Sequence, residues 1–146
     1  MRIVLVSPDD RSCRALGREL SRRASVEILG PCGTGAVRWL DPGTSRDGAV
    51  TVRRFRADYP VVAELERRLA RAVAAGPADP ALQERWVQER GPYSSALLDE
   101  LGECAENCDV VVFFSLDSAL TVLGLPLVGR PAVVVPSVVD WSLAGS

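Results

Sequence analysis

Arginine is the only basic side chain in this chain of 146 residues: all 17 Lys and Arg positions are Arg, and there is no His. The absence of Lys excludes Schiff-base chemistry and the P-loop lysine that reaches the outer phosphates of a nucleotide. The absence of His excludes a Ser-His-Asp or Cys-His nucleophile and any histidine-ligated metal. Phosphate binding would therefore depend on Arg, on backbone N–H groups or on helix N-termini.

The thiols are the remaining candidates for metal chemistry. The chain has four cysteines, Cys13, Cys32, Cys104 and Cys108, and no C-x-x-C pair. Cys104 and Cys108 are four positions apart, which places them on one face of a helix, and the spacings do not match a zinc ribbon. We expect four free, buried thiols, no metal site and no cofactor.

Composition restricts the class of protein. The formal net charge is −2, with 47% hydrophobic and 25% charged residues, as in an ordinary globular domain. This charge balance argues against a nucleic-acid partner. No apolar run approaches the roughly 20 residues of a membrane span, and the first one, residues 3–6, is too short for a signal peptide. We expect a single cytoplasmic domain over residues 1–146.

The elements that would position chemical groups alternate between strands and helices. Apolar runs predict strands at residues 3–6, 26–29, 49–55, 109–114 and 132–135. The first helix follows Asp9 and has an apolar stripe of Cys13, Leu16, Leu20 and Ala24. Further helices are predicted at 62–73, at 80–89, after the Gly91-Pro92 break and at 118–123. The pattern predicts an α/β fold: a single Rossmann-like domain with a mainly parallel sheet and helices on both faces.

Polar side chains follow three of the predicted strands. In parallel sheets the ligand cleft lies at the carboxyl ends of the strands. That rule selects a ligand or partner cleft made of Ser7, Asp9, Ser115, Asp117, Ser137 and Asp140. Each of these residues also suits an ordinary helix cap. The glycines Gly30, Gly33 and Gly35 reverse the dinucleotide-binding spacing and follow the second strand, so residues 30–48 are predicted to be a loop.

A series of motifs between residues 47 and 140 resembles a known family. The motifs occur in order as Asp47 to Phe55 (DGAVTVRRF), Gln83 to Trp86 (QERW), Gly91 to Ser94 (GPYS), Asp109 to Phe114 (DVVVFF), Gly124 to Leu127 (GLPL) and Val135 to Ser137 (VPS). Together they resemble the N-terminal, acceptor-side domain of family-4 glycosyltransferases of the GT-B architecture. The resemblance implies a Rossmann-like fold and a role in glycosyl transfer.

Three departures from that family lie at the expected cleft. The glycine-rich loop after the first strand is replaced by Ser7-Pro8-Asp9-Asp10, which leads directly into the helix. The segment after the central strand, usually rich in Tyr and Thr, runs from Ser115 to Leu120. Val139 stands before Asp140 where the family commonly has a cleft His. Because an aliphatic side chain cannot hydrogen-bond a sugar, we do not expect this chain to catalyse transfer alone.

The resemblance also implies that a C-terminal, donor-binding domain is missing, since GT-B enzymes hold the nucleotide-sugar mainly there. Two functions remain open. The chain could work with a donor-domain protein on a sugar acceptor as one half of a split enzyme. Alternatively, it could be a non-catalytic binding or stabilising partner in a biosynthetic pathway. The free edges of the sheet further predict a homodimer.

Overall fold

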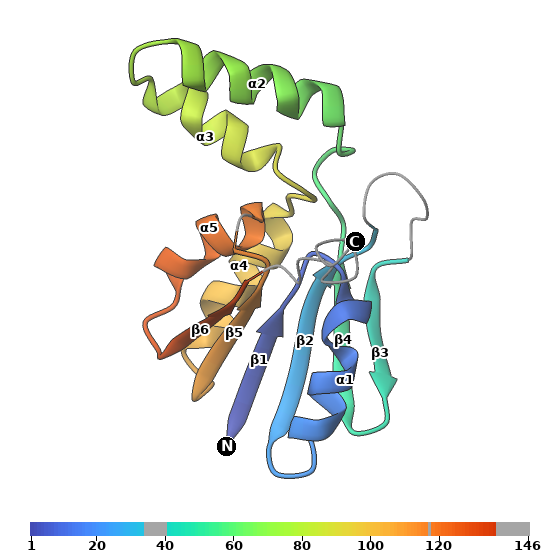
Figure 1. Ribbon diagram of the computed structural model, residues 1–146. Coiled ribbons are helices and arrows are strands. Elements are labelled where there is room, and N and C mark those ends of the chain that lie inside the picture. The colour runs from blue at the N-terminus through green and yellow to red at the C-terminus, as the bar shows by residue number, and fades with distance from the viewer. Residues whose placement is uncertain (34–40, 117, 137–146) are drawn as a thin grey trace, which may run out of the picture.

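The computed structural model describes residues 1–33, 41–116 and 118–136. Six strands in these ranges form one sheet in the order β3-β4-β2-β1-β5-β6 (Figure 1). Every neighbouring pair is parallel except β3 and β4, which are antiparallel. The strands are β1 (Arg2–Val6), β2 (Ser25–Pro31), β3 (Gly43–Asp47), β4 (Val50–Phe55), β5 (Val110–Phe114) and β6 (Ala132–Val135).

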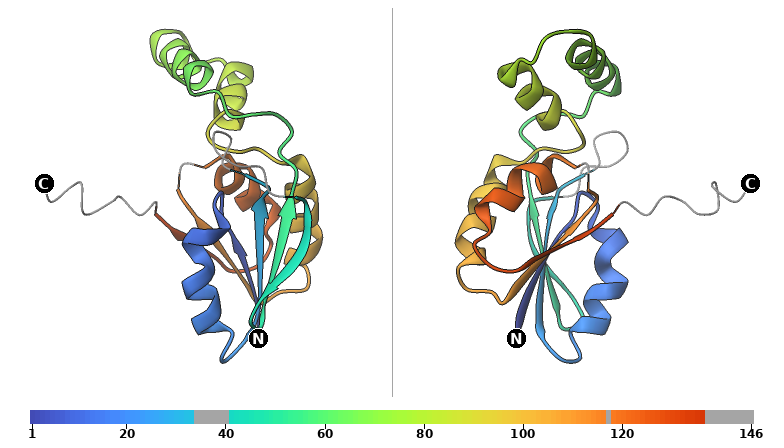
Figure 2. Two further views of the ribbon diagram at one scale, coloured as in Figure 1. Left: turned by 90° about the vertical axis from the view of Figure 1, so that its right-hand side faces the viewer. Right: turned by 60° about the vertical axis from the view of Figure 1, so that its left-hand side comes forward.

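Helices cover both faces of the sheet, as predicted. Helix α1 (Asp10–Leu20) lies on one face, and α4 (Ser95–Ala105) and α5 (Ala119–Gly124) lie on the other (Figure 2). A short 3-10 turn, η1 (Leu125–Leu127), follows α5. The α/β, Rossmann-like fold is therefore confirmed.

The central strands divide their side chains between two cores. In β1, Val4 and Val6 belong to the core under α4, while Ile3 and Leu5 belong to the core under α1. Strand β5 does the same, because successive side chains of a strand point to opposite faces. Its Phe113 is fully buried. The continuous apolar run predicted for a central strand is thus explained by burial from both sides.

The inward face of α1 differs from the predicted stripe. Cys13 is fully buried, but Leu16 is 39% exposed. Gly17 faces the sheet instead, and a Cβ atom there would lie 3.4 Å from the Ile28 Cδ1 atom. The small residue brings α1 close to the sheet, so the contact face is centred on Cys13 and Gly17 and leaves Leu16 at its margin.

The predicted loop over residues 30–48 is partly wrong. Strand β2 continues to Pro31, and β3 pairs with β4 through a two-residue turn, with Asp47 opposite Val50. Gly48 has φ +60 in that turn, the conformation that tight hairpins require. Strand β3 is an edge strand of Gly, Thr, Ser, Arg and Asp, so it has no apolar alternation by which to recognise it.

Helices α2 (Ala63–Ala75) and α3 (Pro80–Gln88) form a hairpin that projects beyond the carboxyl ends of the strands (Figure 1). The Asp79 carboxylate caps α3 by accepting from the Ala81 amide at 3.1 Å. Only Leu69 is buried in α2, and no residue of α3 is. The hairpin therefore forms one wall above the sheet rather than part of its core.

Candidate functional site

A cleft of about 400 Å³ lies at the carboxyl ends of β1 and β5, below the helical hairpin. Strand β1 pairs with β2 on one side and with β5 on the other, so the chain order reverses here. Such a reversal is where open α/β sheets bind their ligands. The lining comes from the β1 and β5 ends and from both ends of the hairpin: Pro8, Val61, Ala63, Glu66, Glu89, Arg90, Gly91, Ser115 and Ser118.

Ser7 and Asp9, both predicted for the cleft, form the turn that begins α1. Ser7 is fully buried, and its hydroxyl donates to the Asp9 carbonyl at 2.6 Å. The Asp9 carboxylate accepts from the Arg11 amide at 3.1 Å as the N-cap of α1. Pro8, which lies between them, lines the cleft, whereas these two residues do not.

Ser115 lines the cleft and has an uncommon backbone. Its φ is +77, and it is the single non-glycine residue with positive φ in the part of the chain that the structure describes. Its amide donates to the Val135 carbonyl at 2.9 Å, and its carbonyl accepts from the Thr121 hydroxyl at 2.6 Å. The fold thus holds Ser115 in this conformation at the floor of the cleft.

The other three predicted residues, Asp117, Ser137 and Asp140, lie outside the described residues. Ser118, which was not predicted, lines the cleft and caps α5 by accepting from the Leu120 amide at 3.3 Å.

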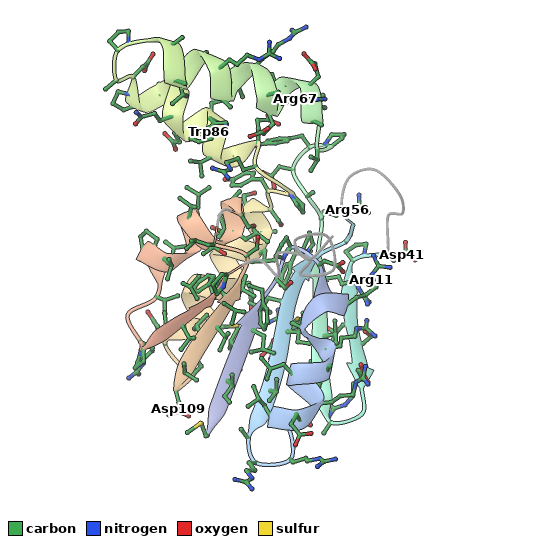
Figure 3. The ribbon with its side chains drawn as sticks, in the orientation of Figure 1. Arg11, Asp41, Arg56, Arg67, Trp86 and Asp109 are labelled. Carbon is green, nitrogen blue, oxygen red and sulfur yellow. The ribbon has the colours of Figure 1, made fainter. Side chains whose placement is uncertain are left out.

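The hairpin contributes a bonded set of side chains to the cleft wall. Glu66 on α2 accepts a hydrogen bond from the Trp86 indole N–H at 3.0 Å (Trp86 is labelled in Figure 3). The Arg90 guanidinium lies over the Trp86 ring, 4.7 Å from its centroid. The Arg90 carbonyl accepts from the Ala119 amide at 3.0 Å. These contacts join α2, α3 and α5 around the cleft.

Glu89 is the most deeply buried of the charged cleft residues that sequence reasoning missed. It follows the last residue of α3, lines the cleft and is only 8% exposed. Burial, and then the negative charge of Glu89, raise the pKa of the nearby Tyr59 hydroxyl to about 12. Nothing in the sequence distinguishes Glu89 from the exposed Glu84 of the same helix, because its burial depends on the turn that follows.

A second group of charges lies away from the cleft, between the sheet and α4. The Arg53 guanidinium donates to Glu27 at 2.9 Å and to Glu100 at 2.8 Å. The hydrogen bond from Arg53 lowers the pKa of the Glu100 carboxyl. Burial, together with Glu27 and Glu100, raises the pKa of the Cys104 thiol to about 11. We call Glu27, Arg53 and Glu100 the Arg53 cluster.

The thiol prediction is confirmed: all four cysteines are free and buried. Burial raises the pKa of Cys32 and Cys108 as well, which keeps these thiols protonated. Across the described ranges no three Cys, Asp or Glu side chains gather in a way that could hold a metal ion. None of the helices in those ranges is long and apolar enough to cross a membrane.

Comparison with known proteins supports the fold. No family model matches the sequence, and no curated protein matches it. Among solved structures, an α,α-trehalose-phosphate synthase (UDP-forming) from Burkholderia vietnamiensis is similar, with a TM-score of 0.52 and 15% identity. The match covers 92% of this chain and 32% of that one, so this chain spans about a third of that protein's length. The likeness supports the Rossmann-like α/β fold described above.

A second match is a sucrose-phosphate synthase from Thermosynechococcus elongatus, with a TM-score of 0.34 and 18% identity over 99% of this chain and 93% of that one.

Proposed function

We propose that this domain forms the acceptor-binding side of a glycosyl-transfer site and that a second polypeptide supplies the side that binds the nucleotide-sugar. The observation that carries this proposal is the open cleft at the carboxyl ends of β1 and β5. It combines the position expected for a ligand with polar groups from Glu66, Glu89, Arg90 and Ser115. The motif resemblance and the glycosyltransferase-like fold support the same class of activity.

The charges of the cleft explain why the donor would bind elsewhere. A nucleotide-sugar carries a diphosphate, which proteins hold with cations or with helix N-termini. Among the described residues that line the cleft, Arg90 supplies the one guanidinium, and Glu66 and Glu89 supply carboxylates. Glycosyl transfer also needs donor and acceptor held together with water excluded. A donor-binding partner closing over this cleft would meet both requirements.

A transfer assay with the purified chain tests this proposal. The chain is incubated with labelled nucleotide-sugars and a pool of sugar acceptors, alone or with a candidate donor-binding protein encoded next to it. We expect no transfer by the chain alone and transfer in the mixture. Transfer by the chain alone would contradict the proposal, and so would a mixture that forms neither a complex nor product.

A matched pair of variants locates the activity. Ala63 lines the cleft at the start of α2 and is exposed, so Ala63→Trp fills the cleft without disturbing the core. Ala74 is exposed near the other end of α2, and Ala74→Trp serves as the control. We expect Ala63→Trp to reduce transfer in the mixture at least tenfold and Ala74→Trp to leave it unchanged. Equal effects would place the acceptor elsewhere.

The second candidate function is a non-catalytic partner, and one observation favours it. The chain has no His anywhere, and Val139 occupies the position where the resembled enzymes commonly have a cleft His. For such a partner, a stable complex would form while Ala63→Trp left the partner's activity unchanged.

A further inference from the structure

Glu89 is buried by the turn that ends the helical hairpin. The residue caps α3 with its backbone N–H, and Gly91 two positions later has φ +85, a conformation that favours glycine. This turn directs the chain back toward the sheet and leaves Glu89 8% exposed at the cleft. By contrast, the side chain of Glu64, on the same hairpin, is 56% exposed.

The Glu89 carboxylate has no hydrogen-bond donor and no ion-pair partner within residues 1–33, 41–116 and 118–136. After burial, the charge of Glu89 raises the pKa of the Tyr59 hydroxyl, which therefore stays protonated. A buried carboxylate normally has an ion-pair or hydrogen-bond partner, because losing its hydration without replacement is costly. Within the described residues no donor bonds to Glu89, and its carboxylate oxygens are not sealed from solvent, so they stay open to the cleft.

Glu66 shows the opposite case in the same cleft. Its carboxylate accepts the Trp86 indole N–H at 3.0 Å, so its role in joining α2 to α3 is accounted for. An ionised carboxylate is an acceptor only, so a ligand that satisfies Glu89 must donate hydrogen bonds. Hydroxyl groups of a sugar or another polyol meet this requirement without bringing a second negative charge.

The charged side chains of the cleft also restrict the charge of the ligand that it can bind. Within the described part of the lining, the two carboxylates of Glu66 and Glu89 outnumber the guanidinium of Arg90, which lies over the Trp86 ring. Arg56 and Asp41 lie on the β3 side of the sheet (Figure 3), and neither lines the cleft. Their charges influence the pKa of the Cys32 thiol instead: burial raises it most, Arg56 lowers it and Asp41 raises it. Because like charges repel, a phosphate group in this cleft would be unfavourable.

Resting on the proposed function, we infer that the cleft takes an uncharged, polyhydroxylated acceptor rather than a phosphorylated one, and that Glu89 accepts a hydrogen bond from one of its hydroxyl groups. Glu89 is then a specificity-determining residue of the acceptor site.

The test is a binding titration of the full chain, followed by NMR through the amides of Gly91 and Ser115. The probes are glucose, mannose and myo-inositol and the monophosphate of each. We expect at least one neutral probe to bind at the cleft and its monophosphate to bind at least threefold more weakly. Glu89→Gln should weaken the neutral probe about tenfold or more, since it removes a hydrogen bond to a charged acceptor. Glu64→Gln, the exposed control, should bind as the wild type does.

Thermal unfolding without ligand gives an independent measurement. Because the Glu89 carboxylate makes no hydrogen bond or ion pair with the described residues, Glu89→Gln should leave the melting temperature within about 2 °C of the wild type. Glu66→Gln should lower it, since the bond to the Trp86 indole weakens. A melting temperature lowered by more than this for Glu89→Gln, or failure of that variant to fold, would overturn the inference.

The remaining outcomes separate the inference from the proposed function. Tighter binding of the monophosphates, binding unaffected by Glu89→Gln, or no binding of any neutral probe would overturn the inference. Transfer in the reconstituted mixture would still uphold the proposed function in each case. Conversely, neutral polyols that bind through Glu89, with no transfer in any mixture, would uphold the acceptor site and refute glycosyl transfer.

Discussion

The Arg53 cluster and the cleft both contain glutamate carboxylates beside an arginine. They differ in whether the carboxylates accept hydrogen bonds from that arginine. Glu100 accepts a hydrogen bond from Arg53 at 2.8 Å, and Glu27 accepts a second one at 2.9 Å. Glu89, more deeply buried than Glu100, has no such donor among the residues described. The difference separates charges that the fold uses to hold itself together from the carboxylate to which we assign a ligand hydroxyl.

The largest expected effect comes from breaking the satisfied side of this comparison. Arg53→Met leaves Glu100 without its guanidinium partner and leaves Glu27 with the contact from Arg2 at 3.4 Å, and we expect a loss of about 2 kcal/mol in the free energy of unfolding. Urea unfolding followed by circular dichroism measures it. Arg67→Met is the control, because the ion pair that Arg67 forms with Glu64 at 3.7 Å is exposed. If the two variants are equally stable, the cluster contributes nothing.

Acid titration should reveal the same cluster. The hydrogen bond from Arg53 lowers the pKa of Glu100 in the folded state. The contribution of Glu100 to the free energy of unfolding is therefore fully present above the unfolded pKa of about 4.3. Stability should fall as the pH drops below that value through the folded pKa. Glu100→Gln should cost about 1 kcal/mol at pH 7 and make the acid limb shallower. Unfolding curves from pH 7 to pH 3 test this, and an unchanged acid limb would exclude Glu100 as its source.

A smaller effect of opposite sign is expected at the floor of the cleft. Ser115 has φ +77, where glycine is unstrained, so Ser115→Gly should stabilise the protein by about 0.5–1 kcal/mol. Ser115→Ala keeps the strain and removes the same hydroxyl. If both variants lose acceptor binding equally, the hydroxyl contributes to the site, whereas a loss in the Gly variant alone would indicate that the backbone conformation matters.

Much of the fold could be predicted because its signals are local. The apolar run at β5 and the caps at Asp9, Asp79 and Ser94 place strands and helix starts from a few neighbouring residues. Strand β3 could not be predicted, because its polar residues become a strand only by pairing with β4. The exposure of Leu16 depended on how closely Gly17 lets α1 approach the sheet.

The residues of the cleft were harder to predict from the sequence than the fold was. The rule that ligands bind at carboxyl strand ends led to Ser115, which lines the cleft, and to Ser7 and Asp9, which form the start of α1. It did not lead to the hairpin wall, since no rule about strand ends refers to residues 61–66 or 89–91. Glu66, Glu89 and Arg90 reach the cleft only because the hairpin projects over the same edge of the sheet.

The sequence alone determined the α/β class, the parallel sheet covered on both faces, the reduced thiols and the exclusion of Lys and His chemistry. These properties follow from residue types and from short-range periodicity, which a linear chain displays directly. The tertiary structure alone decided which charged side chains have hydrogen-bond or ion-pair partners. Arg53 bonds to Glu27 and Glu100 from elements far apart in sequence, while Glu89 has no donor in the part of the chain that the structure describes. Satisfaction of a buried charge depends on long-range neighbours, and only the folded chain brings those together.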